Sequence, residues 1–207
     1  MAAKGVKTTT YSLDWDVIIS LETRLLRDFR SIKSKQKAMD LLSISIGARL
    51  GLRIIDNLEL KWSDLLSVPV GESFIRVEKK TDKERVLVMS TKLHQILTEV
   101  EQVLTPKPDE YIFSSQKGKG LVPMTAQNFN RRLKLILKEY KVRHIGNASS
   151  HLLRKSFVVG AIRKGFETGD YLSLVKVSKL VGHRNVSTTI RYTNFETSQA
   201  FALYELS

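Results

Sequence analysis

The apolar residues of this chain recur mostly at the three- and four-residue spacing of helices. Ser12 can cap a first helix, in which five apolar residues share one face: Val17, Ile18, Leu21, Leu25 and Phe29. Residues 36–50 are apolar on most sides, which predicts a central helix that ends at Gly51. We expect a short helix over residues 53–58, with Trp62-Ser63-Asp64 leading out of it.

A different pattern, with a period of two, runs from Ser73 to Met89 and predicts a β-hairpin. Its turn is expected at Thr81-Asp82-Lys83. Ile75 and Val77 share a face that we expect to pack on the core. The opposite face carries the alternating residues Phe74, Arg76, Glu78 and Lys80. A shift of one residue in register would exchange the two faces.

The second half of the chain returns to helical spacing, with hydroxyl residues at the expected helix starts. Three helices are predicted: one over residues 91–104 capped by Thr91, one capped by Thr125, and one over residues 151–164 capped by Ser149 or Ser150. A fourth helix is expected from about residue 171 to 181. Tyr111-Ile112-Phe113 is predicted to form a short buried strand.

These elements predict the α+β class, mainly α, with a small antiparallel β-sheet. We expect residues 1–11 to form a flexible segment, residues 12–195 a single domain, and residues 196–207 a tail. The tail carries an apolar group that can pack on its own domain or on a neighbouring subunit: Ala200, Phe201, Leu203 and Tyr204.

Composition narrows the class of protein. With 42% hydrophobic and 27% charged residues, the chain has the composition of a soluble globular protein. It has no run of about 20 apolar residues to cross a bilayer, and its start lacks the apolar segment of a secretory signal. The absence of cysteine excludes disulfides and thiolate chemistry. The four histidines are widely spaced, so we expect neither a metal site nor a cofactor: His94, His144, His151 and His183.

The charge points to a partner. Lys and Arg total 34 against 21 Asp and Glu, giving a net charge of +13 and a pI near 9.9. Such an excess favours a nucleic acid, because basic side chains release the counterions of a polyanion. The helix after Thr125 carries an outward basic row that we expect to contact the DNA backbone: Arg131, Arg132 and Lys138.

The residues from Lys179 to Tyr192 hold the main chemical candidates. Gly182 can adopt the left-handed conformation that closes a helix, and His183 follows at once. Asn185 or Ser187 can cap a new helix that carries Tyr192. The imidazole and the phenol are therefore expected to lie close together.

Four upstream residues complete a set suited to a phosphodiester. Arg53 and Arg154 can present charged planar groups to the non-bridging oxygens, whose charge grows in the transition state. His151 shares a helix face with Arg154 and can take the proton of the Tyr192 phenol, the nucleophile. Lys80 in the hairpin can protonate the departing sugar oxygen. The scheme requires no metal or nucleotide.

These residues resemble the catalytic domain of the tyrosine recombinase (phage integrase) family over about residues 12–195. The resemblance rests on four ordered stretches: Gly51 to Asp64, Lys80-Thr81, His151-Leu152-Leu153-Arg154, and Val181-Gly182-His183 through Tyr192. It implies that the arginines and His183 hold the scissile phosphate, that Lys80 is the general acid, and that Tyr192 forms a 3′-phosphotyrosyl bond. The chain departs from the usual pattern at Lys155, Val181 and Asp82.

The resemblance also implies partners. We expect double-stranded DNA as substrate, self-association into a synaptic tetramer, and a bacterial cytoplasmic location on DNA, without a membrane. Family members carry an N-terminal DNA-clamping domain, which we expect to be missing here, so that this chain alone binds and nicks DNA weakly.

The leading hypothesis is a site-specific recombinase or integrase of a mobile element, such as a phage or conjugative transposon. A type IB topoisomerase-like relaxase would share the phosphate chemistry. A catalytically silent DNA-binding module would use the arginines only to hold phosphate. A covalent DNA adduct lost on Tyr192→Phe separates both enzymes from the binder, and relaxation of plasmids without a target site favours the topoisomerase.

Overall fold

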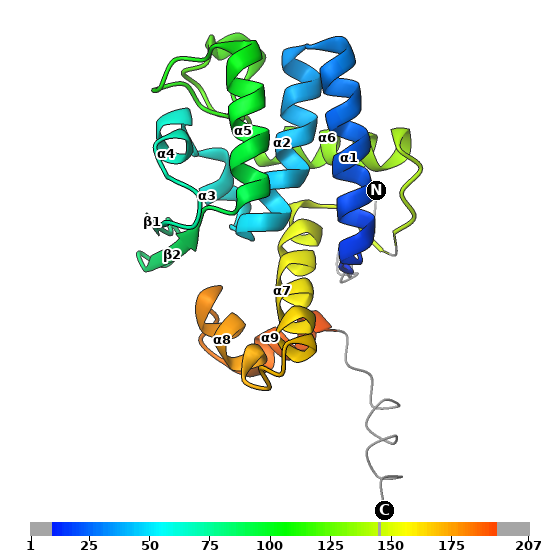
Figure 1. Ribbon diagram of the computed structural model, residues 1–207, viewed down its shortest axis with the longest axis vertical. Helices are drawn as coiled ribbons and strands as arrows, with labels where there is room; N and C mark the ends of the chain where they lie inside the picture. The colour runs from blue at the N-terminus through cyan, green and yellow to red at the C-terminus, as the bar shows by residue number, and fades with distance from the viewer. Residues whose placement is uncertain (1–9, 145, 194–207) are drawn as a thin grey trace, which may run out of the picture.

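Helix α2 is the element around which the other helices pack in the computed structural model, which describes residues 10–144 and 146–193 (Figure 1). α2 (Lys35–Leu50) contacts four other helices: α1 (Trp15–Ile32), α5 (Thr91–Leu104), α6 (Ala126–Glu139) and α7 (Ser150–Glu167). Every residue of α2 from Ala38 to Leu50 is buried except Arg49. The prediction of a central helix is confirmed, and Gly51 ends it in the left-handed conformation, with φ of 55°.

Two short helices follow α2. The predicted α3 (Ile54–Leu58) is confirmed, but Trp62-Ser63-Asp64 is the first turn of a further helix, α4 (Trp62–Leu66), and not an exit segment. The Lys61 backbone N–H donates to the Asp64 carboxylate over 2.9 Å, which satisfies a free donor at the helix start. Trp62 is buried at this point, so α4 is fixed against the core.

The hairpin has the predicted period but the opposite orientation. β1 (Ser73–Val77) pairs antiparallel with β2 (Glu84–Val88), with Ile75 opposite Val86 and Arg76 opposite Arg85. Ile75 and Val77 are 60% and 54% exposed, so the prediction that they pack on the core is wrong. The polar face packs inward instead, because Arg76 donates to the Asp64 carboxylate and to the Glu59 carbonyl.

Three further predictions need correction. Asp14, and not Ser12, occupies the N-cap of α1, and Ser90, and not Thr91, caps α5 by accepting from the Leu93 N–H over 3.3 Å. The strand predicted at residues 111–113 is absent: Tyr111 forms an isolated bridge with Lys61 and a turn follows, although Ile112 and Phe113 are buried as expected. The cap of α6 at Thr125 and the cap position of α7 at Ser149 are confirmed.

The last two helices pack on the far end of α7, at the bottom of the view in Figure 1. α8 (Ser173–Leu180) and α9 (Val186–Thr193) enclose a small apolar cluster with α7: Val158, Ile162, Val177, Val181 and Tyr192. Gly182 joins α8 to α9 with a φ of +67°, the left-handed conformation expected from the sequence. The described part of the chain is thus mainly helical with a two-stranded antiparallel sheet, which confirms the predicted class.

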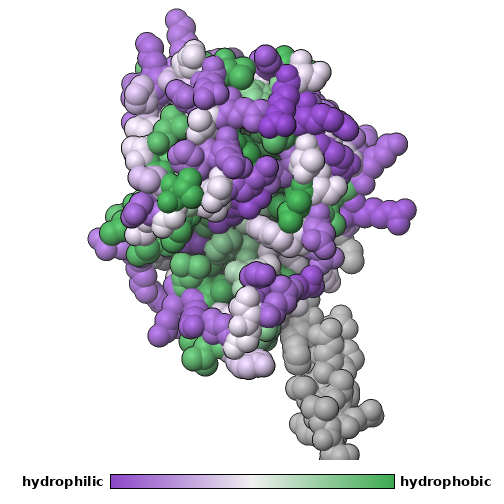
Figure 2. Space-filling model, in the orientation of Figure 1, coloured by the Kyte–Doolittle hydropathy of each residue, from purple (hydrophilic) through white to green (hydrophobic). Residues whose placement is uncertain are grey.

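Most of the predicted N-terminal segment and the whole predicted tail lie outside the described residues. Thr10, at the end of that segment, forms an isolated bridge with Gly146. Figure 2 shows hydrophilic side chains projecting from much of the visible face, with apolar side chains between them. Within residues 10–144 and 146–193, none of the helices combines the length and the hydropathy of a bilayer span.

Candidate active site

The C-terminal end of α2 binds two arginines that come from different elements. The Gly51 carbonyl accepts from Nη1 of Arg154 over 2.8 Å and from Nη1 of Arg85 over 3.0 Å. Nη2 of Arg154 donates to the Val181 carbonyl over 2.6 Å, and Nη2 of Arg85 donates to the Leu50 carbonyl over 2.7 Å. The last carbonyls of a helix lack partners within the helix and carry its negative dipole end. They therefore hold two buried guanidinium groups side by side.

Arg53 brings a third positive charge to this place. It occupies the N-cap position of α3, two residues after Gly51, and forms an ion pair with the buried carboxylate of Glu78. Burial, followed by the positive charge of Arg154, lowers the pKa of Arg85 to about 10. Burial, followed by the charge of Arg53, also lowers the pKa of Arg154. The guanidinium groups of Arg53, Arg85 and Arg154, which we call the arginine cluster, thus lie close enough to repel one another. An added anion would stabilise this arrangement.

Tyr192 lies beside this cluster, between two histidines. Its hydroxyl is 3.0 Å from Nε2 of His151, and its ring stacks on His183 with centroids 5.0 Å apart and planes 18° from parallel. Nζ of Lys155 lies over the same ring, 5.3 Å from its centroid. The small apolar cluster of α7, α8 and α9 holds the rest of the tyrosine, which is 8% exposed. The phenol is thus oriented by polar groups at a buried position.

Both histidines are neutral near pH 7. Burial lowers the pKa of His151 below its ordinary value of 6.5, and the positive charges of Arg154 and Lys155 lower it further. Burial, then the charges of Arg154 and Arg53, lowers the pKa of His183 to about 4. A neutral His151 can accept the phenol proton at Nε2, and His183 uses Nδ1 to bind the Thr189 hydroxyl over 2.8 Å.

Lys80, unlike the other five predicted catalytic residues, takes no part in these contacts. It is exposed in the turn between β1 and β2, and makes no ion pair or hydrogen bond with the part of the chain that the structure describes. Lys79, its neighbour in the turn, forms an ion pair with Glu59, whereas Lys80 has no such partner among the described residues.

The basic row predicted on α6 is only partly outward. Arg131 and Lys138 are exposed, whereas Arg132 turns toward α2 and forms an ion pair with the buried carboxylate of Asp40. The ion pair compensates the buried negative charge of Asp40, so it gives Arg132 a structural role. DNA contact by these three residues stays a prediction, and it is stronger for Arg131 and Lys138.

Arg85, Glu78 and Asp56 belong to the site but were not predicted. Arg85 and Glu78 are 4% and 1% exposed on the inward face of the hairpin, and Asp56 accepts from the Lys79 N–H over 2.9 Å. The period-two pattern placed Glu78 on the same side as Arg76, but the expected orientation of the hairpin turned both outward. Arg85 shares its strand face with Lys83 and Leu87. The more apolar face, with Val86 and Val88, is the exposed one, so the alternation gives no signal that Arg85 is buried.

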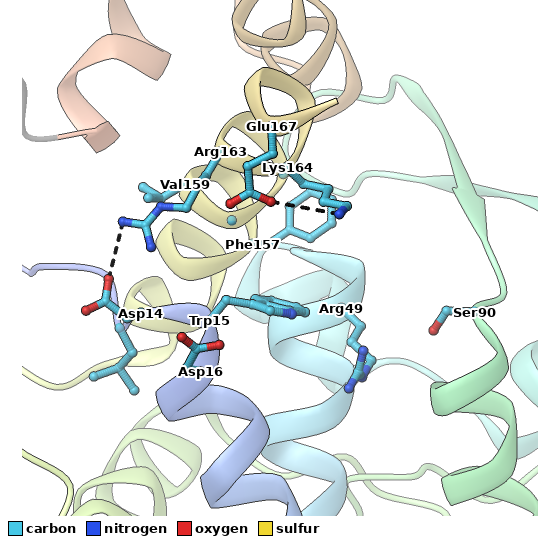
Figure 3. Close-up of a pocket in the computed structure, with 13 residues that line it drawn as sticks. Asp14, Trp15, Asp16, Arg49, Ser90, Phe157, Val159, Arg163, Lys164 and Glu167 are labelled. Carbon is cyan, nitrogen blue, oxygen red and sulfur yellow. Dashed lines mark ion pairs between the residues drawn. The ribbon is translucent and has the colours of Figure 1, made fainter. Parts of the chain in front are cut away.

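A groove of about 580 Å³ lies between the start of α1 and α7 (Figure 3). Trp15, Arg49 and Phe157 are among its lining residues, and ion pairs join Asp14 to Arg163 and Lys164 to Glu167. None of the six predicted catalytic residues lines it. This groove is therefore separate from the cluster of Arg53, Arg85 and Arg154. Among the described residues, no group of three or more His, Cys, Asp or Glu could hold a metal ion.

The same fold occurs in solved recombinase structures. A XerH site-specific recombinase bound to palindromic difH substrate aligns with a TM-score of 0.69 at 20% identity, covering 95% of this chain and 53% of that chain. A lambda integrase dimer bound to a COC′ core site aligns with a TM-score of 0.59 at 17% identity, covering 93% of this chain and 62% of that one.

The sequence itself shows the family. Residues 21–199 match the Phage integrase family, to which this chain belongs. Tyrosine recombinase XerD of Listeria innocua is 34% identical over 150 residues, covering 70% of this chain and 46% of that protein. Tyrosine recombinase XerC of Pseudomonas fluorescens is 27% identical over 205 residues, covering 98% of this chain and 62% of its own length. The chain thus spans about half the length of the curated relatives it matches.

Proposed function

We propose that this chain is the catalytic part of a site-specific DNA recombinase or integrase of a mobile element, and that it cuts DNA through a covalent bond at Tyr192. The observation that carries the proposal is the 3.0 Å contact between the Tyr192 hydroxyl and Nε2 of a neutral His151, beside the arginine cluster. A nucleophile, a base and anion-binding groups thus meet at one place, as phosphoryl transfer to an oxygen nucleophile requires.

The cleavage step needs only groups of this chain and the DNA. His151 takes the phenol proton at Nε2, and the Tyr192 oxygen attacks the phosphorus. The bond between phosphorus and the 5′ oxygen breaks, and that oxygen takes a proton from Lys80. The strand is left with a 3′-phosphotyrosyl bond and a free 5′ hydroxyl. Because one phosphodiester replaces another, the step is close to energy-neutral, and a 5′ hydroxyl of a second strand can reverse it.

The arginines supply the electrostatic part of the reaction. Arg53 and Arg154 would hold the two non-bridging oxygens, whose negative charge grows as phosphorus becomes five-coordinate. A fixed donor at such a position contributes roughly 10²–10³-fold to the rate. Arg154 suits this role because carbonyls of Gly51 and Val181 already fix its guanidinium plane before substrate arrives.

A nicked duplex tests the proposal. The fragment downstream of the nick diffuses away after cleavage, so an adduct between protein and DNA accumulates and is visible as a band in a denaturing gel. We expect this band with the wild-type chain and its loss in Tyr192→Phe. A salt-sensitive mobility shift without any adduct would overturn the proposal in favour of a binding module.

The curated relatives support a second candidate, a recombinase of the Xer type rather than one of a mobile element. Both candidates take double-stranded DNA as substrate and would act as an assembly of several copies, a synaptic tetramer in our proposal. Sequencing the DNA attached to Tyr192 in cells of the source organism separates them. Attachment at the ends of a mobile element supports the first candidate, and attachment at one chromosomal site away from any element supports the second.

A further inference from the structure

Glu78 places a carboxylate inside the arginine cluster. It follows the last residue of β1, and its backbone closes the hairpin turn by accepting from the Asp82 N–H over 2.8 Å. Its side chain points into the protein, where Oε2 forms the ion pair with Arg53 and accepts from the Thr81 hydroxyl over 2.9 Å. A Cβ atom at Gly182 would lie 3.5 Å from the same oxygen. That oxygen therefore lies between Arg53 and the turn that carries His183.

The contacts of Glu78 are incomplete for a buried carboxylate. Its Oε1 is buried without a hydrogen-bond partner among the described residues, and Nη1 of Arg85 is 3.9 Å from it. Buried structural carboxylates are normally fully hydrogen-bonded, because an unsatisfied one costs free energy. One of the two carboxylate oxygens is thus left without a hydrogen bond, which favours exchange of this carboxylate for another anion.

We propose that Glu78 is a resident anion of the phosphate site and that the scissile phosphate displaces it from Arg53. This inference rests on the proposed function, since it takes a DNA phosphate as the incoming anion. Two anions cannot share one guanidinium face without repulsion. Glu78 would therefore set the affinity of the site: it neutralises part of the arginine charge while the site is empty and competes with phosphate for it.

The test compares Glu78→Gln with Glu84→Gln. Glu84 is exposed on the same hairpin, so both variants lose one negative charge, but only the first loses it next to Arg53. Inorganic phosphate is titrated into each protein, with chloride at equal ionic strength as reference, and the dissociation constant is read from NMR chemical shifts. We expect Glu78→Gln to bind phosphate about 5- to 10-fold more tightly than wild type and Glu84→Gln within about twofold.

Unchanged or weaker phosphate binding by a folded Glu78→Gln would overturn the inference and make Glu78 a support for Arg53. Should that variant fail to fold, Thr81→Val decides, because it removes the hydroxyl that helps hold Glu78 without changing the charge. Tighter phosphate binding by Thr81→Val, by about twofold, supports displacement, and unchanged or weaker binding refutes it. If the wild-type chain forms no adduct at Tyr192 but Glu78→Gln binds phosphate more tightly, the proposed function alone is refuted. If the adduct forms but phosphate binding by Glu78→Gln is not tighter, this inference alone is refuted.

Discussion

The hydroxyl oxygen of Tyr192 lies 3.0 Å from Nε2 of His151, although the two residues are 41 positions apart in the chain. The contact joins α9 to the first turn of α7. Burial lowers the pKa of the His151 imidazole below its ordinary value. A neutral ring is therefore ready to accept the phenol proton at physiological pH. The pH dependence of cleavage follows from this relationship.

His151→Gln should slow formation of the covalent adduct at pH 7 by about 10²–10⁴-fold, the usual contribution of a general base. The wild-type rate should rise with pH only up to a point below 6.5, where His151 becomes neutral, and stay level above it. The variant has no imidazole that could lose a proton, so its rate should show no such rise. Single-turnover rates from pH 5 to 10 measure both profiles. A variant with wild-type rate at pH 7 would refute the role of His151.

Lys80→Ala should slow cleavage of ordinary DNA by about 10²-fold, because the 5′ oxygen would leave without a proton. On a substrate with sulfur in place of that oxygen, the leaving thiolate needs no proton, and the variant should match wild type. Lys79→Ala is the matched control, because Lys79 lies in the same turn as Lys80 but forms an ion pair with Glu59. A rate defect that persists on the sulfur substrate would exclude Lys80 as the proton donor.

Arg85→Met should destabilise the fold by about 3 kcal/mol, because it leaves the carbonyls of Leu50 and Gly51 without the charged donor that they share. Urea unfolding followed by circular dichroism measures the loss. Lys83→Met, at an exposed position of the hairpin turn, should change stability by less than about 0.5 kcal/mol. Equal stabilities of the two variants would show that Arg85 does not fix the end of α2.

His183 makes folding stability depend on pH. Its pKa of about 4 in the folded protein lies below the ordinary 6.5, so the unfolded chain binds more protons between these values. Stability should therefore be complete above pH 6.5 and fall as pH decreases toward 4, by about 1 kcal/mol for this partly exposed ring. His183→Gln should reduce that fall, and His144→Gln, an exposed histidine, should not. Urea unfolding at several pH values between 4 and 8 compares them, and an unchanged slope in His183→Gln would contradict the assignment.

The sequence predicts the helices and the meeting of His183 and Tyr192 because these features depend on local signals. Gly182 ends one helix and Asn185 begins the next by accepting from the Ser187 N–H, so the distance from His183 to Tyr192 is set within ten residues. The spacing of His151 and Arg154 likewise places both on one face of α7.

The orientation of the hairpin could not be predicted in the same way. Alternation gives two faces but not which one is buried, and the apolar Ile75 and Val77 suggested the wrong choice. The decisive contacts are long-range: Arg85 to the carbonyls at the end of α2, and Glu78 to Arg53. Such pairs depend on where α2 ends in space, so they emerge only from the folded chain.

The central claim is that Tyr192 itself becomes bonded to DNA. The most direct measurement is to digest the adduct from the nicked duplex with protease and nuclease and to identify the modified peptide by tandem mass spectrometry. We predict a nucleotide phosphate on Tyr192. A nucleotide found on any other side chain, or no modified peptide from protein that binds the duplex, would contradict the claim.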